Sequence, residues 1–148
     1  MPTLHLICGL PCSGKTTLGK RLEQELPALR LCPDEWMYRI VSDGYDQKRR
    51  DAVEAEQWNV AARALALGVN VILENGFWER SERDQYRARA KAIGMQTKLH
   101  YLEVPMEELK RRLAKRNAAM PPDTFHVSEA DLVKWAARFD VPTEEELK

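Results

Sequence analysis

The segment from Gly9 to Thr16, Gly-Leu-Pro-Cys-Ser-Gly-Lys-Thr, matches at every specified position the spacing G-x-x-x-x-G-K-[ST] of loops that bind phosphate groups. Such a loop curls so that its N–H groups point at anionic oxygens, and the following helix adds its positive end. Lys15 supplies a charge for the β and γ phosphates, and the Thr16 hydroxyl is the expected Mg²⁺ ligand. The predicted nucleotide-binding residues are Gly9, Pro11, Cys12, Ser13, Gly14, Lys15, Thr16 and Thr17.

Two carboxylates follow predicted strands and are the next candidates for chemistry. Asp34 comes directly after the second strand and could accept the proton of a substrate hydroxyl that attacks the γ-phosphoryl, or it could simply cap a helix. Glu74 follows the third strand, as in a Walker-B arrangement. It is a predicted ligand of Mg²⁺ or of the substrate, and the alternative is a solvated strand end.

Arginines that could neutralise a transferred phosphoryl group lie in the segment from Lys110 to Arg116. Arg112 and Arg116 are four residues apart and therefore share one face of a helix. We predict Arg116, and less directly Arg112, to be catalytic, while Arg111 is predicted to be a surface residue. The helix end and the following loop, about residues 111–125, are predicted to form a lid.

The predicted binding site for the substrate that receives the phosphoryl group combines aromatic and basic residues with the two carboxylates. Besides Asp34 and Glu74, the candidate substrate residues are Trp36, Arg39 and Arg83, and the adjacent Phe77 and Trp78 could belong either to this pocket or to the core. Arg83 could instead be a surface partner of neighbouring acids. Trp58 and Trp135 are predicted core residues, and the three histidines, His5, His100 and His126, form no evident catalytic group.

The elements that must position these residues alternate between strands and helices. Apolar runs predict strands over residues 3–10, 29–32, 69–73 and 97–104. Helical spacing and caps predict helices over 15–26, 33–41, 47–67, 81–93, 105–117 and 128–139. This alternation predicts a parallel sheet with helical crossovers, in which the carboxyl ends of the strands form one ligand-binding edge.

The amino-acid composition limits the number of domains and the classes of function that can be expected. The 148 residues predict one domain, and 23 basic residues balance 23 acidic ones, so a general nucleic-acid binder is not expected. Three cysteines without a metal-binding or disulfide spacing predict reduced thiols and a cytoplasmic protein. No apolar stretch is long enough to span a membrane.

Taken together, the chain resembles the P-loop kinase superfamily, in particular small AAA-type ATP-binding kinases related to zeta toxin, chloramphenicol phosphotransferase and polynucleotide 5′-kinase. The carriers of the resemblance are GLPCSGKTT at 9–17, PDEW at 33–36, VILENGFWERSERD at 71–84, YLEVPMEELKRRLAKRN at 101–117 and FHVSEADLVKWAARFDVPTEEE at 125–146.

This resemblance implies an α/β P-loop NTPase fold, a three-layer sandwich with a short parallel sheet of four or five strands. It also implies ATP and Mg²⁺ as cofactors, Asp34 as base, and Lys15 and Arg116 as stabilisers of the transferring phosphoryl. The tail near residues 139–142 would close the adenine pocket. The expected function is phosphoryl transfer to a hydroxyl of a small molecule. The alternatives are a polynucleotide 5′-hydroxyl kinase and an ATP-binding switch or weak ATPase that acts through protein interaction.

Overall fold

The computed structural model describes residues 1–148 and contains one parallel sheet with the strand order β2-β3-β1-β4. The strands are β1 Thr3–Cys8, β2 Ala28–Leu31, β3 Asn70–Gly76 and β4 Gln96–Tyr101. The helices are α1 Lys15–Glu25, α2 Pro33–Trp36, α3 Gln47–Ala66, α4 Arg80–Ala92, α5 Met106–Ala119 and α6 Glu129–Ala137. A π-helical segment, Met37–Val41, continues α2, and a 3₁₀ turn, Glu145–Leu147, lies at the C-terminus.

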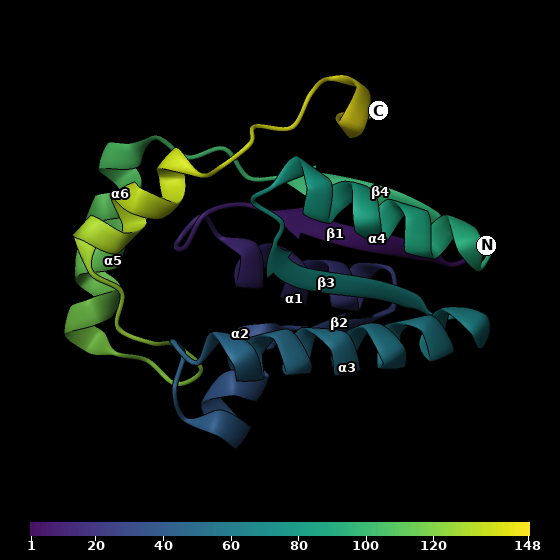
Figure 1. The fold of residues 1–148 in the computed structure, drawn as a ribbon, viewed down its shortest axis with the longest axis horizontal. Coiled ribbons are helices and arrows are strands. Elements are labelled where there is room, and N and C mark those ends of the chain that lie inside the picture. The colour runs from purple at the N-terminus through teal and green to yellow at the C-terminus, as the bar shows by residue number, and fades with distance from the viewer.

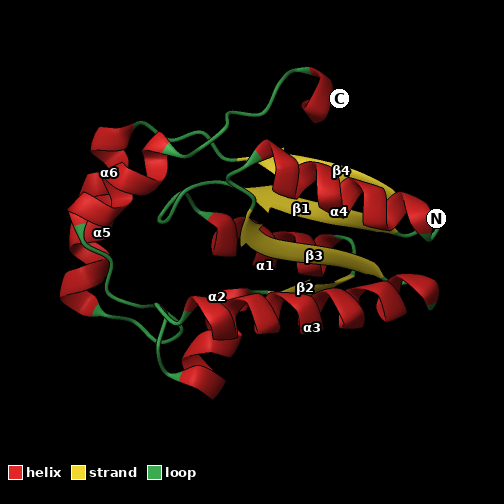
Figure 2. Ribbon diagram, viewed as in Figure 1, coloured by secondary structure: helices red, strands yellow, loops and turns green.

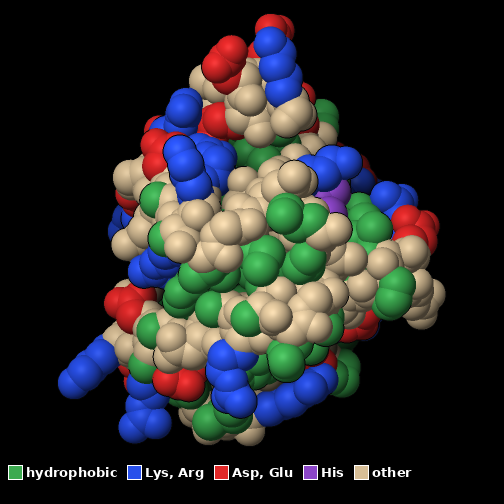
Figure 3. All heavy atoms as spheres, turned by 90° about the vertical axis from the view of Figure 1, so that its right-hand side faces the viewer, with side chains coloured by type: hydrophobic (Ala, Val, Ile, Leu, Met, Phe, Trp, Pro, Cys, Tyr) green, Lys and Arg blue, Asp and Glu red, His purple; other side chains and the backbone are tan.

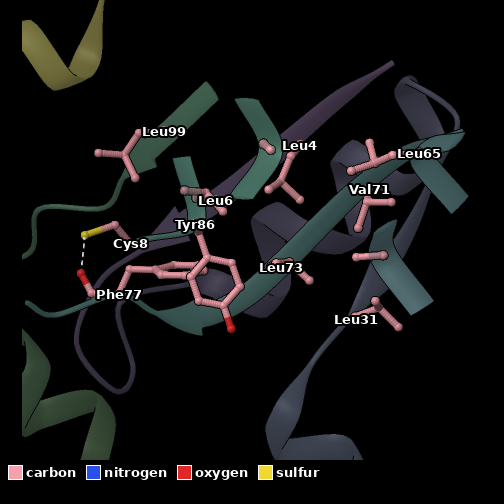
Figure 4. Close-up of a cluster of buried hydrophobic side chains, with 12 residues drawn as sticks. Leu4, Leu6, Cys8, Leu31, Leu65, Val71, Leu73, Phe77, Tyr86 and Leu99 are labelled. Atoms are coloured by element: carbon pink, nitrogen blue, oxygen red, sulfur yellow. Dashed lines mark hydrogen bonds between the residues drawn. The ribbon is translucent and has the colours of Figure 1, made fainter. Parts of the chain in front are cut away.

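Helices cover both faces of the sheet, so the predicted three-layer α/β fold with four parallel strands is confirmed (Figures 1 and 2). On one face, α3 and α4 pack over the apolar side chains of all four strands, and Figure 4 shows this cluster around Leu6, Leu73 and Tyr86. On the other face, α1 packs through Leu22 against Ile7 and Ile72. The sheet is buried on both sides, as its apolar strands predict.

Several element boundaries differ from the prediction because backbone pairing, not hydrophobicity, ends a strand. β3 continues to Gly76, so Glu74 lies inside the strand and not after it. β1 ends at Cys8 and β4 at Tyr101, both earlier than predicted. The predicted helix over 33–41 changes to π-helical geometry at Met37, and the Ser42 N–H donates to the Met37 carbonyl. The predicted cap of α6 is confirmed, since Ser128 Oγ accepts from the Asp131 N–H at 3.0 Å.

The carboxyl ends of the strands all point toward α5 and α6, which stand apart from the sheet at the left of Figure 1. α5 and α6 share a small core of their own, formed by Leu109, Leu113, Val127 and Leu132. The opposite end of the molecule, seen in Figure 3, carries hydrophobic side chains between basic ones, and Leu67, Val69 and Ile93 are exposed apolar residues near the ends of α3 and α4. None of the helices combines the length and the apolar character that crossing a membrane requires.

Candidate active site

The loop between β1 and α1 has the curled backbone that anion binding requires. Cys12 and Gly14 adopt positive φ angles of 67° and 99°, so the chain turns sharply before α1 begins at Lys15. No side chain caps α1. The N–H groups of its first turn are therefore directed at the site without a protein partner and, together with the positive end of the helix, favour an anion.

Gly9 and Ser13 shape this loop from outside the cavity. The Gly9 N–H donates to the Gly76 carbonyl at 2.9 Å and thereby fastens the loop to the end of β3. A Cβ at Gly9 would lie 2.4 Å from Ser13 Oγ, so any other residue there would force Ser13 to move. Ser13 is buried and its hydroxyl has no partner. Both residues support the loop, whereas Pro11, Cys12, Gly14, Lys15, Thr16 and Thr17 line the cavity.

Lys15 extends back over the loop, and its ammonium donates to the carbonyls of Leu10 at 2.9 Å and of Gly9 at 3.2 Å. Burial lowers the pKa of Lys15 below its ordinary value, while the nearby carboxylates of Asp34 and Glu74 raise it. A buried ammonium with this balance gains from further negative charge, which the phosphates of a nucleotide would supply.

Thr16 and Glu74, the two predicted metal ligands, are in direct contact. Thr16 Oγ1 donates to Glu74 Oε1 at 2.9 Å. The other carboxylate oxygen accepts from Arg30 Nη1 at 2.5 Å, and Arg30 also pairs with Glu35. Burial raises the pKa of Glu74, and the Arg30 guanidinium opposes that rise.

The oxygens of Thr16 and Glu74 suit Mg²⁺ better than a metal ion whose ligands all come from protein side chains. No group of three or more His, Cys, Asp or Glu side chains could hold a metal ion. Mg²⁺ commonly uses one or two protein oxygens and completes its shell with water and substrate phosphates. Thr16 and Glu74 beside the phosphate loop offer such a partial set.

Asp34 faces the same cavity from the start of α2, and an arginine fixes its side chain. Arg50 Nη1 lies 2.7 Å from Asp34 Oδ1, and Arg50 Nε lies 3.6 Å from Glu54 Oε2 one turn further along α3. The Asp34 side chain stays about half exposed. Asp34 therefore has one oxygen held by Arg50 and a second that a ligand hydroxyl can reach.

The predicted catalytic arginines lie on α5, and both line the cavity. Arg112 Nη1 donates to the Cys12 carbonyl at 3.1 Å, so this residue ties α5 to the phosphate loop. Arg116 Nε is buried and has no partner. Arg111 pairs with Glu108 and is largely exposed, in keeping with its predicted surface position. The Arg116 guanidinium makes no hydrogen bond or ion pair, unlike Arg112 and Arg111.

These residues surround a single cavity of about 710 Å³ at the carboxyl edge of the sheet. Its walls come from the phosphate loop, α2, α3, the end of β3, the start of α4, α5, the loop after α5, and α6. Besides residues already named, the lining includes Lys20, Tyr45, Asn75, Gly76, Trp78, Glu79, Glu82, Phe125, Trp135 and Arg138.

Three predicted substrate residues lie elsewhere. Arg83 is fully buried, its guanidinium pairs with Glu146 at 2.8 Å, and it donates to the Phe77 carbonyl at 2.9 Å. Trp36 packs against the core cluster under α3. Neither side chain lines the cavity, so the prediction that Arg83 and Trp36 bind the substrate is wrong. The sequence spacing placed both residues at the correct edge of the sheet, but their side chains point into the protein.

Arg39, the third of these residues, binds the loop that follows α5. Its guanidinium makes a double hydrogen bond to Asp123, at 3.1 Å and 2.9 Å. Close by, Tyr38 contacts Phe125 edge-on, and Tyr45 Oη donates to the His126 carbonyl. The segment after α2 and the loop after α5 therefore meet across the cavity. Arg39 therefore stabilises the loop beside the cavity through Asp123 and does not itself line the cavity.

The structure adds cavity residues that the sequence did not indicate. Arg50, Glu54 and Glu82 lie on helices, where charged residues ordinarily face water, so no local signal marks them. Trp135 was predicted to be core but also lines the cavity and lies 5.4 Å from Trp78, centroid to centroid. Of the two aromatic residues that could belong to the pocket or to the core, Phe77 is fully buried in the core and Trp78 lines the cavity.

The tail is fixed beside this wall. The Asp140 N–H donates to the Trp78 carbonyl at 2.8 Å, and Phe139 stacks on Tyr101. A small recess of about 40 Å³, lined mainly by apolar side chains of Leu10, Tyr101, Leu102, Val104, Leu109 and Phe139, lies next to the phosphate loop. The tail thus contacts the region where the adenine end of a nucleotide was expected, although this recess is too small for a purine.

Comparison with known proteins agrees with this architecture. The family model described as "AAA domain" matches residues 4–142, almost the whole chain. The match includes the phosphate loop, Asp34, Glu74 and α5 with Arg116.

Three solved structures share the fold. A Chloroflexus aurantiacus protein, described provisionally as a kinase, has a TM-score of 0.76 at 22% identity, covering 96% of this chain and 82% of the other. Kti12 from Chaetomium thermophilum, in complex with ADP-AlF3, has a TM-score of 0.71 at 20% identity, covering 96% and 82%. A gluconokinase from Sinorhizobium meliloti has a TM-score of 0.66 at 17% identity, covering 97% and 78%. At these identities the similarity establishes the fold.

Proposed function

Because the chain belongs to the AAA domain family, whose model spans residues 4–142, we propose that it is an ATP-dependent phosphotransferase acting on a hydroxyl of a small molecule. The observation that carries this proposal is the position of Asp34. Its carboxylate faces the phosphate loop across one cavity and is oriented by Arg50 at 2.7 Å. A protein that only senses a nucleotide has no need of an oriented carboxylate at that place.

ATP is the proposed donor. The uncapped start of α1 and Lys15 would hold its phosphates, and the similar structure of Kti12 contains ADP and AlF3. Thr16 and Glu74 are the residues that would hold Mg²⁺. When bound, this ion neutralises charge on the β and γ phosphates. Arg116, which lines the cavity and makes no ion pair, would stabilise the charge that spreads over the transferred group, and Arg112 would keep α5 against the loop.

The proposed reaction conserves all atoms. The acceptor oxygen forms a bond to the γ-phosphorus while the bond from that phosphorus to the β–γ bridging oxygen breaks. The hydroxyl proton passes to the free oxygen of Asp34, and the products are ADP and a phosphate ester. Since such transition states are loose, Asp34 contributes mainly by orienting the hydroxyl and receiving its proton late.

The test uses γ-labelled ATP, Mg²⁺ and a pooled set of small alcohols, sugars, antibiotics and 5′-hydroxyl oligonucleotides. We expect label on a small-molecule acceptor. Label on oligonucleotides would instead assign a polynucleotide kinase, and label appearing as free phosphate alone would assign an ATPase or switch. Both results contradict the proposal.

A companion measurement tests the donor site separately. Saturating Mg-ATP at about 100 times its Kd adds about 2.7 kcal/mol to the stability of a protein that binds it. We expect this thermal stabilisation in the natural protein and its loss in Lys15→Ala. Lys91→Ala, in an exposed position on α4, serves as the matched control and keeps the shift. Equal shifts in all three proteins would show that the nucleotide site is misplaced.

A further inference from the structure

The walls of the cavity formed by α3 and the start of α4 are rich in acidic side chains. Glu54 from α3, Glu79 just before α4 and Glu82 in the first turn of α4 all line it, next to Asn75 near the end of β3. The cations Lys15, Lys20, Arg112 and Arg116, from α1 and α5, also line the cavity. We call the carboxylates of Asp34, α3 and the start of α4 the acceptor half of the cavity.

Cations of the protein do not neutralise the acceptor half. Arg50 is shared between Asp34 and Glu54, and Arg138 pairs with Glu79 at the exposed rim. Glu82 makes no ion pair and no side-chain hydrogen bond. Four carboxylates thus face two guanidinium groups, and one carboxylate is left without a partner.

Asn75 positions Glu54 in this half of the cavity. Its Nδ2 donates to Glu54 Oε1 and to Tyr86 Oη, both at 3.3 Å, which fixes the orientation of the amide. The Asn75 Oδ1 atom is buried beneath the cavity surface and is not open to a ligand. Glu82 is therefore the unpaired polar group that this half of the cavity offers to a ligand.

Aromatic rings form the remaining wall. Trp78 and Trp135 lie 5.4 Å apart between centroids, and Tyr45 lies 6.3 Å from Trp135. Trp78 Nε1 donates to the Gly9 carbonyl at 3.1 Å, so its ring is held in place. Aromatic faces attract cations, and they also pack against the C–H faces of polyols.

From these contacts we infer that the acceptor is an amine-bearing alcohol, a polyol or sugar whose protonated amine binds Glu82 beside the tryptophan wall while its hydroxyl reaches Asp34. This inference rests on the proposed function and narrows its substrate class. Acceptors that carry carboxylate or phosphate groups, including nucleic acids, are repelled by the same carboxylates.

The charge of Glu82 gives this recognition a pH dependence. Burial, together with Glu54 and Glu79, raises the pKa of Glu82 to about 7, and Arg50 and Arg83 oppose that rise. A bound ammonium favours the ionised form. Affinity for an amine-bearing acceptor should therefore weaken as pH falls through 7, whereas affinity for a neutral polyol should change little.

The experiment compares glucamine, sorbitol and gluconate, which share a six-carbon polyol chain and differ by an amine, a hydroxyl and a carboxylate at one end. Binding is measured by calorimetry at pH 8 with the protein loaded with Mg²⁺ and a non-hydrolysable ATP analogue. We expect glucamine to bind about tenfold or more tighter than sorbitol, as a charge-assisted hydrogen bond predicts, and gluconate to bind weakest.

Glu82→Gln keeps the size of the side chain and removes its charge, so it should abolish the preference for glucamine. Glu56→Gln, in an exposed position on α3, is the matched control and should retain it. The inference is overturned if gluconate binds as tightly as glucamine, if none of the three binds, or if Glu82→Gln keeps the preference. Since binding is read without catalysis, a glucamine preference without transfer of label would count against the proposed function alone.

Discussion

Gly19 occupies a position in α1 where any side chain would strike the candidate metal ligand. A Cβ there would lie 2.3 Å from Glu74 Oε2 and 3.1 Å from Arg30 Cδ. Both of these atoms belong to the buried pair that orients Glu74, whose side chain is only 1% exposed. The glycine is thus required by close approach and not by backbone freedom.

Gly19→Ala should therefore destabilise the protein, although the same substitution in a helix usually stabilises it. In a helix interior, replacing glycine by alanine ordinarily stabilises by about 0.5–1 kcal/mol. Here we expect a lower free energy of unfolding in urea and a weaker Mg-ATP affinity, because Glu74 must move away from Arg30 and Thr16. A variant that is more stable and binds Mg-ATP normally would refute this role.

At this scale the sequence predicted carboxylates at the carboxyl ends of strands and missed the arginines that pair with them. Asp34 and Glu74 could be expected at one edge because parallel strands deliver their carboxyl ends together. Arg30 and Arg50 could not, since their partners lie 44 and 16 residues away and the pairing depends on how α2, α3 and the sheet pack. Arg83 failed for the same reason, because its partner Glu146 is 63 residues distant.

Among the elements, β1 and β4 share a pair of histidines with consequences for stability. His5 Nδ1 and His100 Nε2 lie 2.9 Å apart, and His5 is buried. Burial, His100 and Lys98 lower the pKa of His5 from 6.5 to about 4, and burial also lowers the pKa of His100. The unfolded chain therefore binds protons at a higher pH than the folded one.

The sign of this linkage predicts acid destabilisation. Below about pH 6.5 the unfolded state binds protons that the folded state does not bind. The free energy of unfolding therefore falls as pH drops toward 4. Urea titrations at pH 7, 5.5 and 4.5 should show a smaller decrease in His5→Gln than in the natural protein. His126→Gln, at an exposed position, should retain the full decrease. Identical pH profiles for His5→Gln and the natural protein would contradict the account.

Across the whole molecule, the C-terminal turn is a structural part of the domain. Glu146 pairs with Arg83 and Arg87 of α4, both at 2.8 Å, and its side chain is 2% exposed. Burial raises the pKa of Glu146, but hydrogen bonds from Arg83, the Thr143 N–H and Arg87 outweigh it and hold this pKa at about 2. The turn thereby covers α4 and fixes the segment that supplies Trp78 and Glu82 to the cavity.

Glu146→Gln leaves the fully buried Arg83 without its counter-charge. Removing one member of a buried ion pair costs about 3–5 kcal/mol, so we expect a decrease of that order in the free energy of unfolding. Glu145→Gln changes an exposed neighbour in the same turn and should be nearly neutral. Denaturant unfolding of the two variants provides the comparison, and equal stabilities would remove the structural role assigned to the tail.

The central claim is that the cavity transfers a phosphoryl group to an alcohol. Its most direct measurement is the partition of label from γ-labelled ATP between acceptor and free phosphate in the natural protein and in Asp34→Asn, with ATP affinity measured in parallel. We predict that Asp34→Asn binds ATP normally but loses transfer by about 10²–10⁴-fold, the contribution typical of a positioned base. Undiminished transfer in Asp34→Asn, or label found only as free phosphate in the natural protein, would contradict the claim.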